Sequence, residues 1–538
     1  MSGITRKEAP SRKHPALLLG GGNSSRVNND TPKGHTHKKH PVSGTQACFA
    51  SPLILNEGFN IVAATQTTQT GKQTLLAHRL AEYADSLSYD NLPKEALQEA
   101  KRRIIDSLGC AIGAKDSDPA RISRTVARLS ESKDGATVIF TKHKSSVENA
   151  AFANGVLFRY LDFNDTYLSL EPAHPSDNIA AILAVAEAEG KNGKDILTAI
   201  VLAYEIQCRL CDAASIRARG WDHVTYGSFS AGLASGKLYG LDKTQLVHVQ
   251  GLAATPNNAM RQTRVGELSN WKGCAFANAS RNAVFAALLA KHGMTGPSEI
   301  FEGEMGFWKQ ISGEFELPTL GGVNGAAFMI NKTYVKHFPA EYHSQSAIEA
   351  AFELRDQIVK HTGVKAPQDI DQHIESITIE SFDAAVDIIA GFKEHWRPQS
   401  RETADHSMPY CVSAALMDGE ITLDTFTQER IQDARLVDLI QKVKVNRNAK
   451  MTAGYPEGIP NLIVIKLADG KVFEKEVAYP LGHAKNPMQD SDIEHKFRTL
   501  AKRAFDEKQI QKQLDALWKI EDCQNIGDIL KLFVLDEQ

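Results

Sequence analysis

The chain has 538 residues, of which 42% are hydrophobic and 23% are charged, and its formal net charge is −4. This length allows two domains and a large buried core, and the composition is that of a globular protein. Such a balanced charge argues against general nucleic-acid binding, which requires a broad excess of lysine and arginine. No stretch approaches the roughly 20 consecutive apolar residues that cross a bilayer, so neither nucleic acid nor a membrane is an expected partner.

Residues 1–70 differ from the rest of the chain, because they are rich in Ser, Thr, Asn, Gly, Lys and His and show no sustained hydrophobic period. We therefore predict a disordered N-terminal extension. The seven cysteines are scattered and odd in number, which indicates a reducing compartment rather than a disulfide framework, and we expect the protein in the cytoplasm. The extension is also basic, so the mitochondrial matrix is the alternative if it is a transit peptide.

From Gln73 onward the apolar residues recur with the helical period, and Leu76, Leu80 and Ala84 share one face. Five longer segments rich in alanine and leucine follow, at 179–189, 193–214, 226–239, 243–254 and 270–292. We predict a large all-helical domain over residues 71–331. Cys208 and Cys211 form a C-x-x-C pair inside one of these helices, and without a second pair no zinc site is expected.

Strand patterns begin only in the second half of the chain. Residues 374–382 alternate apolar and polar side chains, and 440–447 is a second candidate strand. The runs 462–467 and 472–477 flank Asp469-Gly470, a dipeptide that favours the positive φ angles of a tight hairpin turn. We predict a smaller α+β domain over 332–481, followed by C-terminal helices over 482–538. The fold class expected is mainly α.

A concentration of polar residues lies between two apolar helical segments. It consists of Asp162-Phe163-Asn164-Asp165-Thr166 and Ala173-His174-Pro175-Ser176-Asp177-Asn178. Burying these residues without a function would require many compensating hydrogen bonds, so the segment predicts a site. The alternative is a helix-capping loop in which Ser176 or Asp177 is the N-cap.

These two motifs resemble the MmgE/PrpD family, which includes 2-methylcitrate dehydratase and cis-aconitate decarboxylase. The resemblance covers roughly residues 72–535, and several further blocks in one order are far more specific than one short motif. The further blocks are Gly220-Trp221-Asp222-His223, Trp271-Lys272-Gly273-Cys274-Ala275, Lys336-His337-Phe338-Pro339-Ala340-Glu341-Tyr342-His343, Glu402-Thr403-Ala404-Asp405-His406-Ser407-Met408-Pro409-Tyr410 and Tyr479-Pro480-Leu481-Gly482-His483.

The resemblance implies a metal-independent lyase without a cofactor that acts on a tricarboxylate as a homodimer. Its expected reaction is dehydration of 2-methylcitrate to 2-methyl-cis-aconitate in the methylcitrate cycle of propionate catabolism. The smaller domain would then be a lid over a cleft of the helical domain, which the C-terminal helices rejoin. The alternatives are a cis-aconitate decarboxylase that forms itaconate and a non-catalytic carboxylate-binding protein on the same fold.

Dehydration requires a base, an acid for the leaving hydroxyl and cations that hold the carboxylates. Residues carried over from the family's site as catalytic are Asp162, His174, His223, Lys272 and Tyr410. Those expected to bind the substrate are Thr166, Lys272, Lys336 and His343. An ammonium group presents three donors, and imidazole gives or takes a proton near neutral pH, but the sequence does not say which residue is base and which is acid.

Other residues have weaker claims to the site. Asp165 and Asp177 are candidate orienting residues, and Arg261 or Arg264 is a candidate for a third carboxylate. The chain has Glu171-Pro172-Ala173 where bacterial 2-methylcitrate dehydratases of the family have Glu-Trp-Gly. This difference beside the expected pocket leaves the substrate open.

Overall fold

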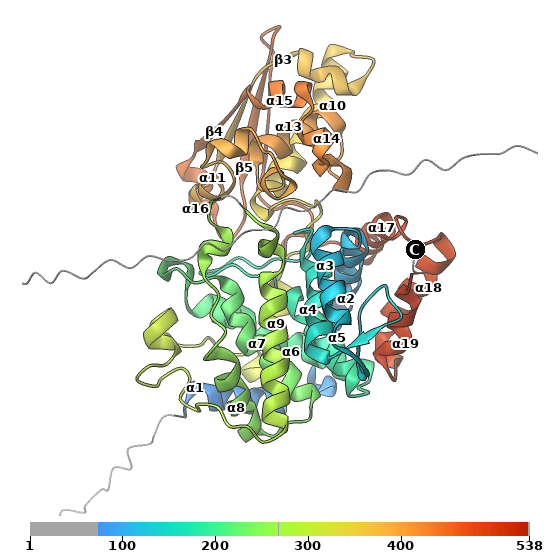
Figure 1. Ribbon diagram of the computed structural model, residues 1–538. Helices are drawn as coiled ribbons and strands as arrows, with labels where there is room; N and C mark the ends of the chain where they lie inside the picture. Colours follow the sequence, from blue (N-terminus) through green and yellow to red (C-terminus); the bar gives the residue numbers. More distant parts are fainter. Residues whose placement is uncertain (1–73, 267, 536–538) are drawn as a thin grey trace, which may run out of the picture. The chain divides into compact units, whose positions relative to one another are not determined.

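The computed structural model describes residues 74–266 and 268–535 (Figure 1). The predicted disordered extension and transit peptide lie outside these residues. Within them the fold is mainly helical, as predicted. Among the described helices, none combines the length and apolar character needed to cross a membrane.

The five long predicted helices are all present. They are α5 (Ile179–Ala188), α6 (Gly193–Ala213), α7 (Gly227–Leu238), α8 (Lys243–Ala254) and α9 (Ala275–Lys291). Asn192 and Asp242 begin α6 and α8 as N-caps that accept a hydrogen bond from the third helical residue. A short 3₁₀ turn, Asn270–Gly273, precedes α9, so this helix begins later than predicted and leaves Lys272 outside it.

The helices before α5 are α1 (Leu76–Ser86), α2 (Lys94–Ala114), α3 (Asp118–Arg128) and α4 (Val147–Arg159). α4 packs closely against α9 (Figure 1). A Cβ atom on Gly155 of α4 would lie only 2.9 Å from the Cβ of Ala277 in α9, so this contact requires glycine. The close packing of α4 fixes the position of its C-terminal end, which the polar residues 162–166 follow.

The expectation of an all-helical first half missed one small sheet. Strands β1 (Glu131–Thr137) and β2 (Lys144–Ser145) pair antiparallel, with an irregular register between Glu131 and Ala136. The β1 sequence carries mostly charged and small residues, with no alternation of apolar side chains. Hydrophobic periodicity therefore gives no strand signal there.

The second half contains a four-stranded sheet. Its strands are β3 (Ile374–Ser381), β4 (Val443–Arg447), β5 (Asn461–Leu467) and β6 (Val472–Val477), in the order β4-β3-β5-β6. β3 and β4 are parallel, and the other neighbours are antiparallel. Gly470 has a φ of 86° in the turn between β5 and β6, which confirms the predicted hairpin.

Helices cover this sheet and continue after it. α10 (Gln345–Thr362) contacts β5 and β6, and α13 (Met408–Asp418) contacts α10 and β4. The apolar side chains of this part form a cluster of their own. After the sheet, α17 (Asp490–Ala501) packs against α2 and contributes Ile493, Phe497 and Leu500 to the larger helical core. The chain thus leaves the helical core and returns to it.

Further helices lie in the second half. They are α11 (Asp383–Ile389), α12 (Arg401–Ala404), α14 (Gln428–Ile431), α15 (Ala434–Ile440), α16 (Ala449–Gly454), α18 (Glu507–Trp518) and α19 (Ile526–Leu530). The turn between α12 and α13 carries residues 405–407. It is one of the segments that reach the candidate site.

Candidate active site

Asp162 lies at the centre of a buried charged cluster. It follows the C-terminal end of α4 and has a φ of 51°, in the left-handed region that a residue with a Cβ enters at a cost. Arg159, in the last turn of α4, donates to the Oδ1 atom of Asp162. The backbone thus turns sharply here and directs one carboxylate into the interior.

Two lysines from distant segments converge on this carboxylate. Lys336 Nζ donates to the backbone oxygen and to Oδ1 of Asp162, both at 2.7 Å. Lys272 Nζ donates to the Oδ2 atom at 3.2 Å. Both lysines are buried. The structure therefore brings together three of the residues that the sequence predicted, and a single carboxylate faces three cationic side chains.

His174 and His223 lie beside this group, with ring centroids 5.7 Å apart. His174 Nδ1 is 2.7 Å from the backbone oxygen of Asp165. A carbonyl oxygen only accepts, so Nδ1 carries the proton and Nε2, which lies 4.0 Å from Asp162 Oδ1, carries the lone pair. His223 Nδ1 is 3.2 Å from Asp222 Oδ1, and its buried Nε2 atom has no hydrogen-bond partner among the described residues.

Burial sets the charge states of these groups. It lowers the pKa of His174 well below its ordinary value, aided by Arg159 and Lys336, and it lowers the pKa of His223 to about 3. Burial alone raises the pKa of the Asp162 carboxyl, but the neighbouring cations outweigh it and hold that pKa well below the usual range. Near neutral pH the two imidazoles are neutral and Asp162 is ionised.

Two of the remaining predicted residues also lie near the cluster. Thr166 donates from Oγ1 to the backbone oxygen of Ala173 at 3.2 Å, and so joins the two polar motifs. His343 Nδ1 is 2.7 Å from Glu341 Oε1. The backbone N–H of Glu341 in turn donates to the backbone oxygen of Asp405 at 2.8 Å. His343 is therefore connected to the cluster through Glu341 and Asp405.

Tyr410 is not brought to this cluster. It lies inside α13, its ring packs near Phe426 in the apolar cluster around the sheet, and its hydroxyl donates to the backbone oxygen of Thr425. The hydrogen-bonding capacity of its donor is thus already used within that part of the fold.

Sequence reasoning did not select three residues that reach Asp162 or its neighbours. Besides Arg159, these are Asp405 and His406. His406 Nε2 is 3.4 Å from Asp162 Oδ2, and its Nδ1 is 2.5 Å from Asp405 Oδ1. Both residues stand in the block from Glu402 to Tyr410 that carried the family resemblance, so the signal was present. For Arg159, the signal in the sequence was its position at the end of an apolar helical segment.

Two of the weaker candidates, Asp165 and Arg264, hold groups next to the predicted histidines. Asp165 accepts hydrogen bonds from the Tyr204 hydroxyl at 2.6 Å and from the Ser176 backbone at 3.0 Å. Arg264 lies 2.7 Å from Asp222 Oδ2 and so supports the partner of His223. Such contacts orient the groups that hold the two imidazoles.

The capping alternative has no support in the hydrogen bonds at this turn. Neither the 3₁₀ turn Pro175–Asn178 nor α5 receives a cap bond from the side chain of its own N-cap residue, His174 or Asn178. The Oγ of Ser176 and Oδ1 of Asp177 instead accept from the side chain of Asn164, at 2.9 and 2.7 Å. Burial raises the pKa of Asp177 to about 7.

Glu171 ties two loops together beside the cluster. Its Oε2 atom accepts from the backbone N–H groups of Ile216 and Arg217 at 2.8 and 2.9 Å. The segment Glu171-Pro172-Ala173 is therefore fixed to the loop before His223.

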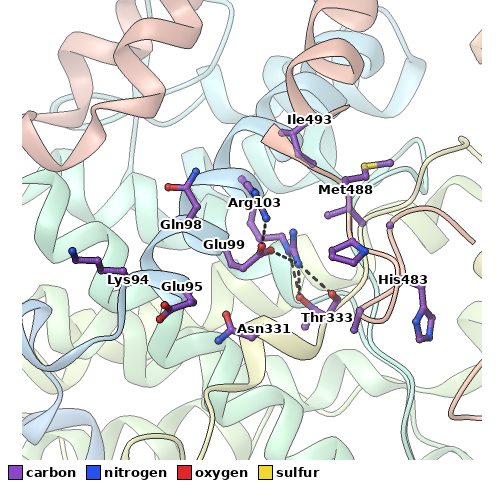
Figure 2. A pocket seen from close by; sticks show the side chains of 15 residues that line it. Lys94, Glu95, Gln98, Glu99, Arg103, Asn331, Thr333, His483, Met488 and Ile493 are labelled. Carbon is purple, nitrogen blue, oxygen red and sulfur yellow. Dashed lines mark hydrogen bonds and ion pairs between the residues drawn. The ribbon is translucent and has the colours of Figure 1, made fainter. Parts of the chain in front are cut away.

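A cavity of about 670 Å³ lies elsewhere, between α2, residues 331–335, 482–488 and α17 (Figure 2). Arg103 on its wall lies 2.9 Å from Glu99 and donates to Thr333. None of the predicted site residues lines it, and Glu99 on its wall pairs with both Arg102 and Arg103. Among the described residues, no group of three or more His, Cys, Asp and Glu side chains is arranged to hold a metal ion.

Comparison with known proteins agrees with the resemblance. Residues 78–319 match the MmgE/PrpD N-terminal domain and residues 338–520 match the MmgE/PrpD C-terminal domain. A 2-methylcitrate dehydratase of Escherichia coli (strain K12) is 31% identical over 456 residues, which cover 80% of this chain and 91% of the relative. The 2-methylcitrate dehydratase, mitochondrial, of Yarrowia lipolytica is 31% identical over 461 residues, with coverage of 81% and 86%. An alkylcitrate dehydratase, phiI, of a fungal species is 30% identical over 468 residues, with coverage of 81% and 89%.

Proposed function

The chain belongs to the MmgE/PrpD family, and we propose that it is a hydro-lyase that dehydrates 2-methylcitrate to 2-methyl-cis-aconitate without a metal ion, as in the methylcitrate cycle of propionate catabolism. The observation that carries the proposal is the buried cluster in which Arg159, Lys272 and Lys336 surround the single carboxylate of Asp162. Buried lysine and arginine side chains held in this way can bind the carboxylates of a substrate.

In the proposed reaction the lysines hold substrate carboxylates while negative charge develops beside them. Lys272 and Lys336 each donate to Asp162 in this structure, and an ammonium group has further donors to share with a substrate. The Nε2 atom of His174 or His223 takes the proton from the carbon next to a carboxylate. Their neutral charge state at neutral pH suits this role, because a base must be unprotonated before it reacts.

We further propose that residues 332–481 act as a lid over the helical part formed by 71–331 and 482–538. Lys336, His343 and His406 come from this segment, whereas Asp162, His174 and Lys272 come from the helical part. A site assembled from both is complete only when the two parts meet, and such closure excludes water from the reaction.

The test is to incubate the purified protein with 2-methylcitrate, a longer alkylcitrate, citrate and cis-aconitate, with and without a metal chelator. Products are followed by mass and ultraviolet absorbance. Loss of water from 2-methylcitrate that survives chelation supports the proposal. Faster loss of water from the longer alkylcitrate would instead identify an alkylcitrate as the substrate. Itaconate and carbon dioxide from cis-aconitate would instead indicate the decarboxylase, and binding without turnover would indicate a non-catalytic protein.

Assembly and location complete the proposal. We expect a homodimer, and a sedimentation experiment that gives only monomer at micromolar concentration would contradict it. We expect the cytoplasm, with the mitochondrial matrix as the alternative because one relative is named mitochondrial. Fluorescent fusions with and without residues 1–70 distinguish the two compartments.

A further inference from the structure

We propose that His406, oriented by Asp405, is the general acid that protonates the leaving hydroxyl of the substrate. This inference rests on the proposed dehydratase function and deepens it. It concerns a residue that precedes α13 and belongs to the segment 332–481 rather than to the helical part.

The contacts of His406 place a carboxylate oxygen at each ring nitrogen. Nδ1 is 2.5 Å from Asp405 Oδ1, and Nε2 is 3.4 Å from Asp162 Oδ2. A protonated imidazole donates from both nitrogens, so this position has an acceptor for each proton. The ring is held on one side by Asp405 and presents its other N–H to the centre of the cluster.

Asp405 is itself fixed in place. It is buried, and its Oδ2 atom accepts from Arg401 Nη1 at 3.2 Å. Its backbone oxygen accepts from the backbone N–H of Glu341 at 2.8 Å. A carboxylate held in this way fixes both the tautomer and the direction of the imidazole bound to it.

Other charged groups also face the ring. Lys272 Nζ lies 3.1 Å from His406 Nδ1, and its charge disfavours a protonated imidazole. The same ammonium group is 3.2 Å from Asp162 Oδ2 and 3.7 Å from Asp405 Oδ1, and these carboxylates offset its charge. The groups that act electrostatically on or with His406 are Asp162, Asp405, Lys272, Glu341 and His395.

The three histidines of the cluster therefore have different surroundings. His174 has a carbonyl oxygen at Nδ1 and lies near the cations Arg159 and Lys336. His223 has one carboxylate, which it shares with Arg264. Only His406, among these three described rings, has a carboxylate at each nitrogen. The geometry assigns proton acceptance to the first two and proton donation to the third.

The proposed dehydration moves one proton to a base and one proton to the leaving oxygen. A histidine Nε2 removes the proton from the carbon next to a carboxylate, and the C–H electron pair becomes the second bond of the new C=C. The C–O bond breaks on the neighbouring carbon, its electron pair stays on oxygen, and that oxygen takes the proton from His406 Nε2 and leaves as water. The base has gained one proton and His406 has lost one, and exchange with solvent restores both.

The experiment compares His406→Asn and His406→Gln with the control His361→Asn. His361 also pairs with an aspartate, since its Nε2 is 2.8 Å from Asp469 Oδ2, but it lies exposed near the β5–β6 turn. The His406 variants are expected to lose about 10²–10⁴-fold in kcat and to lose the limb of the pH profile that requires a protonated acid. His361→Asn is expected to stay within threefold of wild type.

A chloro analogue, in which chloride replaces the leaving hydroxyl, separates a lost acid from a misfolded site. Chloride leaves without a proton, so the His406 variants are expected to keep most of the wild-type rate on this substrate. The inference would be overturned if the His406 variants lost activity equally on the chloro analogue and on the hydroxy substrate. It would also be overturned if their kcat on the hydroxy substrate were within threefold of that of His361→Asn. Wild-type protein that converts none of the acids would overturn the proposed function and this inference together, whereas an active wild type with unaffected variants overturns the inference alone.

Discussion

The Nζ atom of Lys336 lies 2.7 Å from both the backbone oxygen and the Oδ1 atom of Asp162, so one ammonium group fixes the backbone turn and the carboxylate at the same time. Lys336 is 174 positions further along the chain than Asp162 and is almost completely buried. The contact links the helical part to the segment that we propose as a lid.

Lys336→Met is expected to impair both activity and stability. Methionine retains much of the volume but removes a cation from Asp162, and loss of one electrostatic donor lowers kcat by about 10²–10³-fold. Breaking a buried pair costs about 3–5 kcal/mol, and we expect the lower end because Arg159 and Lys272 still contact Asp162. The measurements are steady-state kinetics and urea unfolding.

The matched control is Lys466→Met, which removes an exposed pair with Glu375. Exposed pairs contribute at most about 1 kcal/mol, so this variant should behave as wild type. Comparable losses in the two variants would contradict the role assigned to Lys336.

The free energy of unfolding is expected to depend on pH through His223. Its pKa falls to about 3 in the folded protein and returns to about 6.5 on unfolding. The unfolded chain therefore binds more protons between these values, and the stability contributed by the neutral ring is lost as pH falls from about 6.5 towards 3, by up to about 1.4 kcal/mol per pH unit. His174 acts in the same direction, because its pKa is also lowered.

Asp177 opposes this trend, because its pKa is raised to about 7 by burial and its proton stabilises the folded protein most at low pH. We therefore compare the free energies of unfolding of wild type and His223→Gln, measured by urea unfolding from about pH 4 to 7. The variant should show the weaker decline on acidification, and parallel curves would contradict the assignment.

Tyr410→Phe is expected to change kcat by less than threefold. The hydroxyl donates to the Thr425 backbone oxygen rather than to the charged cluster, so its removal should cost about 1 kcal/mol of stability through the lost hydrogen bond. Kinetics and thermal unfolding test this. A loss of 10²-fold or more in kcat with an intact fold would support the catalytic role that the sequence predicted.

Gly155→Val is expected to destabilise the protein by about 1–3 kcal/mol. The new Cβ would meet Ala277 at 2.9 Å and push α4 away from α9. Because α4 ends just before Asp162, kcat should fall with stability. Thr125→Leu on the exposed side of α3 is the control for added apolar volume, and equal unfolding midpoints for the two variants would contradict the packing argument.

The amino-acid sequence by itself determined the helices, the β5–β6 hairpin and the family. These features depend on local patterns: helical periodicity at 193–214, a turn dipeptide at Asp469-Gly470, and short blocks in a fixed order. Asp162 and the lysines 110 and 174 positions away were predicted to share one site only because the family blocks name those residues, and the structure adds their direct pairing.

Tertiary structure alone decided which members of a block face the site. His406 and Tyr410 are four residues apart, but His406 lies in the turn before α13 and reaches Asp162, whereas Tyr410 lies inside the helix. The direction of a helical side chain is fixed by the face that packs, and here that face turns Tyr410 into the apolar cluster around the sheet. Burial, which lowers the pKa of His174 and His223, likewise arises only when distant segments close around the rings, because desolvation is a property of the packed structure and not of the sequence pattern.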